Sequence, residues 1–175
     1  MIILNEPIAG LLVLQPRVFE DERGFFLETW QKETFRKLGV ENDFVQDNWS
    51  RSEKGVLRGL HYQVQYPQGK LISVRSGSVF DVAVDIRRDS PTFGKWHGEV
   101  LSEENKLQVY VPPGFAHGFC VLSDNTDFTY KCTDYYHPED EAGIRWDDPD
   151  LKIGWPVKDP TVSDKDRALP LFREI

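Results

Sequence analysis

Short apolar runs separated by turn residues recur along this chain at intervals of about ten residues. Runs of this length are typical of β-strands, and only residues 31–38, ending at Gly39, show the pattern of a helix. We therefore expect strands at residues 11–14, 25–28, 44–48, 56–64, 70–75, 78–86, 98–101, 106–111, 118–122 and 127–134. This pattern predicts an all-β sandwich or jelly-roll barrel with one short helix, followed after Tyr136 by an irregular tail rich in Pro, Asp and Trp.

Length and charge narrow the class of protein. The 175 residues contain no internal repeat or linker, so we expect one domain spanning residues 1–175. A net charge of −8 argues against nucleic acid as a partner. The first 14 residues lack a basic start, and a proline, a glycine and polar residues interrupt their apolar runs. We therefore expect neither a signal peptide nor a membrane span, and we expect the protein to be cytoplasmic. Cys120 and Cys132 lack CxxC spacing, which predicts two free, partly buried thiols.

The stretch 56–70 combines a strand pattern with three cationic or titratable side chains. Arg58, His61 and Lys70 lie within 13 positions, and a Pro-Gln-Gly turn precedes the lysine. A histidine can transfer a proton near neutral pH, and a lysine in an apolar wall can stabilise an oxyanion. The alternative is an edge strand whose charges face water.

Strand alternation indicates which side chains could share the interior of the fold. The groups are Phe80, Val82, Val84 and Ile86; Phe128, Tyr130 and Cys132; Phe115, His117, Phe119 and Val121; and Lys70, Ile72 and Val74. Lys70, His117 and Tyr130 could thus point into one cavity. Arg58 and His61 have opposite parity, so both line that cavity only if the strand bulges near Gly59. A lone buried Tyr or His is usually a hydrogen-bonded core residue, but polar groups converging on an apolar interior favour a functional site.

A series of motifs runs through the chain in order. They are 19–26 (FEDERGFF), 46–48 (QDN), 58–63 (RGLHYQ), 68–70 (QGK), 80–85 (FDVAVD), 90–94 (SPTFG), 113–119 (PGFAHGF), 130–136 (YKCTDYY) and 163–166 (SDKD). Together they resemble the dTDP-4-dehydrorhamnose 3,5-epimerase family of the cupin superfamily, over about residues 1–170. The resemblance implies a cupin-type jelly roll, a homodimer, no cofactor, and action on dTDP-4-dehydro-6-deoxy-D-glucose in dTDP-L-rhamnose synthesis. Cys132 and Trp49 depart from the family pattern, in which a threonine and a polar residue are more usual.

Inverting a carbon next to a ketone requires a base, a group that stabilises the enolate, and an acid on the opposite face. His61 suits the base, since an unperturbed histidine has a pKa of about 6.5. By resemblance, Asp166 is the carboxylate that orients its imidazole. Tyr130 suits the acid and Lys70 the enolate partner, and His117 is expected to assist at the ketone oxygen.

The resemblance also implies a set of substrate-binding residues. They are Arg23, Glu28, Gln46, Asp47, Asn48, Arg58, Lys70, His117, Tyr136, Glu141 and Lys165. Among these, Arg58 is expected to contact the pyrophosphate through a charge-assisted hydrogen bond. In the family the N-terminal segment reaches the neighbouring subunit, so Arg23 and Glu28 are expected to complete the partner's site.

Other functions are compatible with parts of this pattern. Relatives within the family epimerise one carbon, isomerise the ketone or use other nucleotide sugars. A metal-dependent cupin oxygenase or a non-catalytic sugar-binding cupin is a further alternative, because residues 113–117 resemble the second cupin motif. The histidines at positions 61, 97, 117 and 137 form no His-x-His pair, so we expect no metal site.

Overall fold

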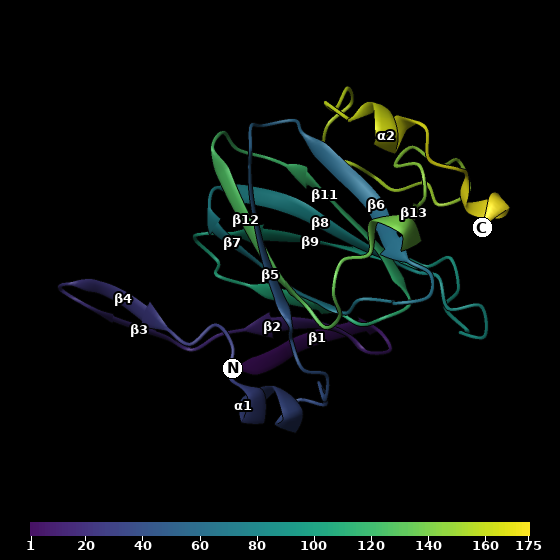
Figure 1. Cartoon of the computed structure of the whole chain (residues 1–175). Helices are drawn as coiled ribbons and strands as arrows, with labels where there is room; N and C mark the ends of the chain where they lie inside the picture. The colour runs from purple at the N-terminus through teal and green to yellow at the C-terminus, as the bar shows by residue number, and fades with distance from the viewer.

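A computed structural model describes residues 1–175 and shows two antiparallel sheets that face each other (Figure 1). The larger sheet has the order β1 (Ile2–Ile8), β2 (Leu11–Gln15), β10 (Gln108–Val111), β7 (Lys70–Ser76), β12 (Thr126–Cys132) and β5 (Gln46–Ser52). The smaller sheet has the order β13 (Glu141–Gly143), β6 (Leu57–Gln63), β11 (Phe115–Val121), β8 (Ser78–Asp85) and β9 (Trp96–Ser102). The all-β prediction is confirmed, with the two sheets remaining separate layers rather than one closed barrel.

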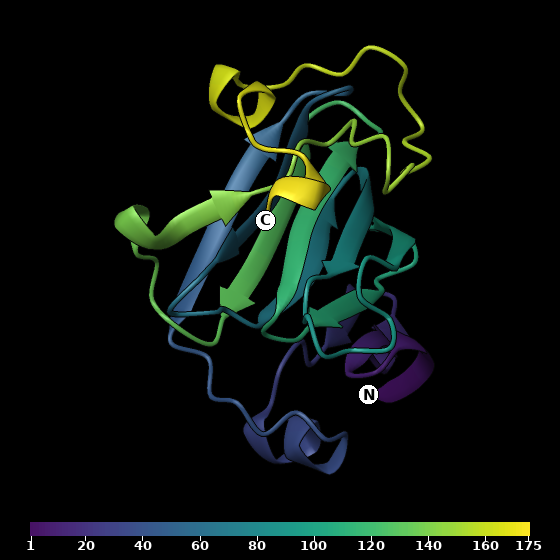
Figure 2. The same ribbon diagram turned by 90° about the vertical axis from the view of Figure 1, so that its right-hand side faces the viewer.

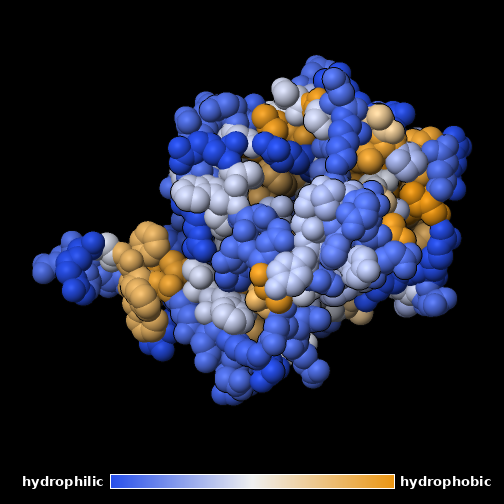
Figure 3. Space-filling view, viewed as in Figure 1, coloured by the Kyte–Doolittle hydropathy of each residue, from blue (hydrophilic) through white to orange (hydrophobic).

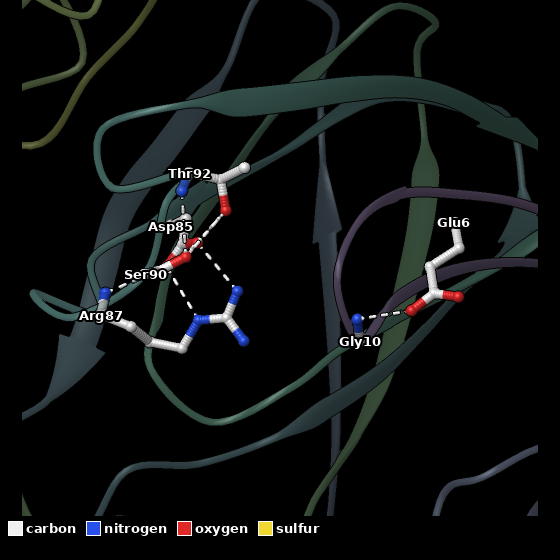
Figure 4. A network of polar contacts seen from close by, with 6 residues as sticks. All are labelled: Glu6, Gly10, Asp85, Arg87, Ser90 and Thr92. Carbon is white, nitrogen blue, oxygen red and sulfur yellow. Dashed lines mark hydrogen bonds and ion pairs between the residues drawn. The ribbon is translucent and has the colours of Figure 1, made fainter.

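Each predicted strand overlaps an observed strand, but three observed strands were not predicted. Two of them are short: β3 (Val18–Asp21), which pairs with β4 (Gly24–Leu27) in a hairpin, and β13 at the edge of the smaller sheet. The third is β1, an edge strand that is mostly exposed and irregular in register, so it lacks the alternation of a half-buried strand. Its turn to β2 is closed at Gly10, whose backbone N–H donates to Glu6 Oε1 at 2.8 Å (Figure 4).

The predicted helix is confirmed as α1 (Lys32–Lys37). The Gln31 side chain caps it by accepting from the Thr34 N–H at 2.6 Å, and Gly39 follows its end with a φ of +88°. Phe35 is buried against the outer face of the larger sheet, which anchors the helix there.

The prediction of only one short helix and an irregular tail was wrong in part. A second helix, α2 (Asp164–Arg167), and two 3₁₀ turns, η1 (Pro138–Asp140) and η2 (Phe172–Glu174), lie in the C-terminal segment. Helix α2 is a single turn capped by Ser163, whose hydroxyl accepts from the Asp166 N–H at 3.1 Å. Such a short helix carries too few residues to show a helical period in the sequence.

The main hydrophobic core fills the space between the two sheets. As predicted, Ile72 and Val74 of β7, Phe128 of β12 and Phe119 of β11 belong to it. The prediction failed for the face of β8 that carries Phe80, Val82, Val84 and Ile86. These side chains pack on the outer face of the smaller sheet, against Ile144, Leu151 and Phe172 of the C-terminal segment. Figure 2 shows the ribbon of this segment lying over that sheet. The inner face of β8 carries Val79 and Ala83 instead.

Two further features bear on the sequence predictions. Cys120 and Cys132 are free and buried, as expected. Among the helices, none combines the length and the apolar character required to cross a membrane.

Candidate functional site

A cavity of about 760 Å³ opens between the two sheets. Its wall includes Gln46, Asn48, Arg58, His61, Lys70, His117, Tyr130, Tyr136, Glu141, Lys165 and Asp166, all of them residues that the sequence analysis selected. The strands that contribute them come from both sheets, and the last two residues come from the C-terminal segment. The cavity is therefore bounded by groups from both sheets, as is required when a base and an acid act on opposite faces of one carbon.

A bulge in β6 allows Arg58 and His61 to face the same cavity, which meets the condition set by their opposite parity. Arg58 pairs with Phe119 of β11 and His61 pairs with His117, so β6 advances three residues while β11 advances two. The bulge contains Gly59, at a φ of +123°. A Cβ at this position would lie 2.6 Å from the Gly118 Cα, so only glycine fits.

His61 is paired with a buried carboxylate. Its Nε2 lies 2.7 Å from Oδ1 of Asp166, which helix α2 holds at 4% exposure. The other oxygen, Oδ2, accepts the backbone N–H of Gly59 at 3.0 Å. Burial acts to raise the pKa of Asp166, but the hydrogen bonds from His61 and Gly59 outweigh it and lower the pKa. Asp166 therefore remains a charged acceptor that orients the imidazole and leaves its Nδ1 free of protein partners.

Lys70 and Tyr130 lie on neighbouring strands of the larger sheet, facing His61 across the cavity. The Lys70 Nζ lies 6.0 Å from the centre of the Tyr130 ring and makes no ion pair. Burial lowers the pKa of Lys70, while the charges of Asp81 and Glu141 partly oppose this effect. Burial also raises the pKa of Tyr130 to about 12, so the phenol keeps its proton at neutral pH.

A second pair of imidazole and carboxylate forms part of the cavity wall. His117 Nε2 lies 2.8 Å from Oδ2 of Asp81, and both side chains are buried. The sequence analysis selected His117 but missed Asp81. Alternation could have found it, because Asp81 lies between Val79 and Ala83 on the inner face of β8, the face that the sequence analysis did not choose.

Polar and charged side chains surround the mouth of the cavity. Glu141 Oε2 accepts from Tyr136 Oη at 2.5 Å and pairs with Lys165 Nζ at 2.6 Å. Burial acts to raise the pKa of Glu141, but Lys165 and Tyr136 outweigh it and lower the pKa. Across the mouth, the exposed Arg58 donates to Ser52 Oγ at 3.1 Å.

Three predicted binding residues lie outside this cavity. Asp47 is on the outer face of β5, where it pairs with Lys131 Nζ at 2.8 Å. Arg23 pairs with Asp21 at the tip of the β3–β4 hairpin, which projects from the body of the protein (Figure 1). Glu28 is exposed just after β4. The chain that carries Arg23 and Glu28 does not bring them to its own cavity.

Comparison with known proteins gives consistent matches along nearly the whole chain. Residues 5–174 match the family described as dTDP-4-dehydrorhamnose 3,5-epimerase. A relative of that name from Pseudomonas aeruginosa is 56% identical over 95% of this chain and 93% of its own length. One from Shigella flexneri is 54% identical, again over 95% of this chain and 93% of its own. The crystal structure of a dTDP-6-deoxy-D-glucose-3,5-epimerase from Legionella pneumophila, in complex with dTDP-4-keto-L-rhamnose, superposes with a TM-score of 0.96 at 56% identity, covering 99% of this chain and 93% of that one.

Proposed function

Because the chain belongs to the dTDP-4-dehydrorhamnose 3,5-epimerase family, we propose that it inverts C3 and C5 of dTDP-4-dehydro-6-deoxy-D-glucose without a cofactor. The chain is an enzyme of the isomerase class. The product of the proposed reaction is dTDP-4-dehydro-L-rhamnose, a precursor of dTDP-L-rhamnose. Both reacting carbons flank the C4 ketone, so loss of either proton gives an enolate whose charge the ketone oxygen carries.

The observation that carries this proposal is the division of the reacting groups between the two sheets. His61 and Asp166 lie on one side of the cavity, and Tyr130 and Lys70 lie on the other. We assign His61 as the base, acting through Nδ1, because its Nε2 is bonded to Asp166. Tyr130 is then the acid that returns a proton to the opposite face of the ring.

Lys70 suits the third role, that of stabilising the enolate oxygen. Lys70 is half-buried in the cavity wall and its ammonium group makes no ion pair, so its charge is available to an anion that develops there. At the mouth, Arg58 and Lys165 are cations within reach of a ligand, and we assign them to the pyrophosphate. The acidic chain thus carries a local group of cations where the nucleotide sugar would enter.

We also propose that the enzyme acts as a homodimer in which the β3–β4 hairpin of one subunit completes the site of the other. The hairpin exposes Phe19, Phe25 and Phe26 at 48%, 60% and 69%. Figure 3 shows an apolar patch on the part of the molecule that projects from the body. Arg23 and Glu28 lie on or beside this hairpin, away from their own cavity. Light scattering on the purified protein tests the dimer: a monomer at micromolar concentration would contradict the proposal.

The reaction is tested by incubating the enzyme in D₂O with dTDP-4-dehydro-6-deoxy-D-glucose and following deuterium by NMR. We expect deuterium at both C3 and C5, together with the L-configured product. Deuterium and inversion at a single carbon would indicate a mono-epimerase instead. Absence of exchange at both carbons would contradict the proposed function.

A further inference from the structure

Asp81 and His117 form a pair that the proposed proton transfers do not use. They lie on the neighbouring strands β8 and β11, and their side chains are only 2% and 7% exposed. The hydrogen bond from His117 Nε2, at 2.8 Å, is the only one that the Asp81 side chain makes. A carboxylate buried in this way depends on its single partner, since an unpaired buried charge is costly.

The pairing determines which nitrogen of His117 carries a proton. A carboxylate accepts hydrogen bonds, so the N–H must be on Nε2. Burial lowers the pKa of His117, and although Asp81 opposes this, Lys70 and His61 add to it. A neutral imidazole has one N–H, which leaves a lone pair on Nδ1. This nitrogen has no protein partner, and His117 lines the cavity, so the lone pair is available to a ligand.

The cations of the cavity make an acceptor useful. Lys70, in the cavity, and Arg58, at its mouth, can only donate hydrogen bonds, and they suit the ketone oxygen and the phosphates. A sugar ring also carries hydroxyl groups, whose protons need acceptors when they leave water. A ketone oxygen, in contrast, has no proton to give to the lone pair of Nδ1.

We propose that Asp81 is a positioning residue that holds His117 as the Nε2–H tautomer, so that Nδ1 accepts a hydrogen bond from a hydroxyl group of the sugar. His117 then determines specificity for a hydroxylated ring, and the contact to the ketone oxygen falls to Lys70. This replaces the role at the ketone oxygen expected from the sequence. The identity of the sugar rests on the proposed function, whereas the tautomer rests on the pairing with Asp81 alone.

The tautomer can be observed directly by ¹⁵N NMR of histidine-labelled protein. The resonances of His117 are identified by their loss in His117→Gln. We expect Nε2 to be protonated and Nδ1 to be unprotonated at neutral pH. A proton on Nδ1, or on both nitrogens, would overturn the proposal, and this experiment needs no variant of Asp81.

Binding measurements test the acceptor role independently of catalysis. The ligands are dTDP-glucose and its 2-deoxy-2-fluoro and 3-deoxy-3-fluoro analogues, because a C–F group cannot donate a hydrogen bond. Loss of one neutral hydrogen bond should weaken binding of one analogue to the wild type by roughly 2- to 12-fold. Asp81→Leu should remove this preference, because Nε2 loses its acceptor.

Equal binding of the three ligands to the wild type would overturn the proposal, as would an unchanged preference in Asp81→Leu. If Asp81→Leu fails to fold, the NMR experiment and the wild-type affinities still decide. Failure of the proposed function is a separate result, since it would be seen as absence of deuterium exchange by the wild type while the tautomer and the hydroxyl preference persist.

Discussion

Replacing Asp166 by Asn should convert His61 to the wrong tautomer. The amide oxygen of the new side chain would keep the hydrogen bond from the Gly59 N–H, since the amide nitrogen cannot accept it. The amide nitrogen would then donate to His61 Nε2, now 2.7 Å from an Asp166 oxygen. The imidazole proton would move to Nδ1, and the nitrogen that faces the substrate would have no lone pair.

Two effects combine in the expected loss of activity. Loss of a charge-assisted hydrogen bond costs about 1.5–3 kcal/mol, which slows a step that forms imidazolium roughly ten- to hundredfold. A histidine held in the wrong tautomer loses more, about 10⁴-fold in kcat where this has been measured in a serine protease. We therefore expect the rate of exchange at C3 and C5 to fall by about 10³ to 10⁴, with little change in affinity for dTDP.

The assay is the initial rate of deuterium incorporation in D₂O, with dTDP affinity measured by calorimetry. Asp164→Asn is the matched control: it makes the same change on an exposed side chain of the same helix and should leave the rate within about twofold of wild type. Retention of more than a tenth of the wild-type rate in Asp166→Asn would refute the role given to this carboxylate.

Three further predictions concern other residues. With Tyr130→Phe, the substrate should still incorporate deuterium while much less inverted product forms, because His61 can return a proton to the face it came from. Equal loss of exchange and inversion, measured by NMR, would exclude Tyr130 as the acid. Lys70→Met should lower kcat by roughly 10² or more if the ammonium acts as an oxyanion donor, and a change confined to KM in steady-state kinetics would instead indicate a ground-state contact. Asp85→Asn should lower the free energy of unfolding by about 3 kcal/mol at pH 7, because the buried carboxylate accepts from Arg87, Ser90 and Thr92 (Figure 4). Burial acts to raise the pKa of Asp85, but these hydrogen bonds outweigh it and depress the pKa. The stabilisation by the charged carboxylate is therefore fully present above the unfolded pKa of about 3.9 and is lost as the pH falls below that value. The difference in unfolding free energy between wild type and Asp85→Asn, measured by urea unfolding, should shrink over the same range, and a constant difference would contradict this reasoning.

The sequence by itself determined ten of the thirteen strands, because strand formation and turns leave a local pattern. The alternation that groups Lys70 with Ile72 and Val74, and Tyr130 with Phe128, correctly identified inward faces, since each of these strands has one clearly apolar face. The opposite parity of Arg58 and His61 meant that both could line the cavity only if the strand bulged near Gly59, and the structure has that bulge. The motifs identified the family before any contact was known.

On β8 the same reasoning could not choose the correct face. Phe80, Val82 and Val84 are more apolar than the residues on the other face, but the C-terminal segment covers them from outside. Both faces of this strand are buried, so periodicity does not distinguish the inner face from the outer one. Asp81 was missed for this reason, although it lies on the inner face beside His117.

Only the tertiary structure decided which groups meet. His61 and Asp166 are 105 residues apart in the chain, and a one-turn helix with no periodic signal brings them to 2.7 Å. The hairpin that carries Arg23 projects away from the cavity of its own chain, which no local pattern reveals (Figure 1). The physical reason is that the alternation of buried and exposed residues is a property of a single strand. The site depends on which strands and loops lie beside each other, and long-range packing determines this arrangement.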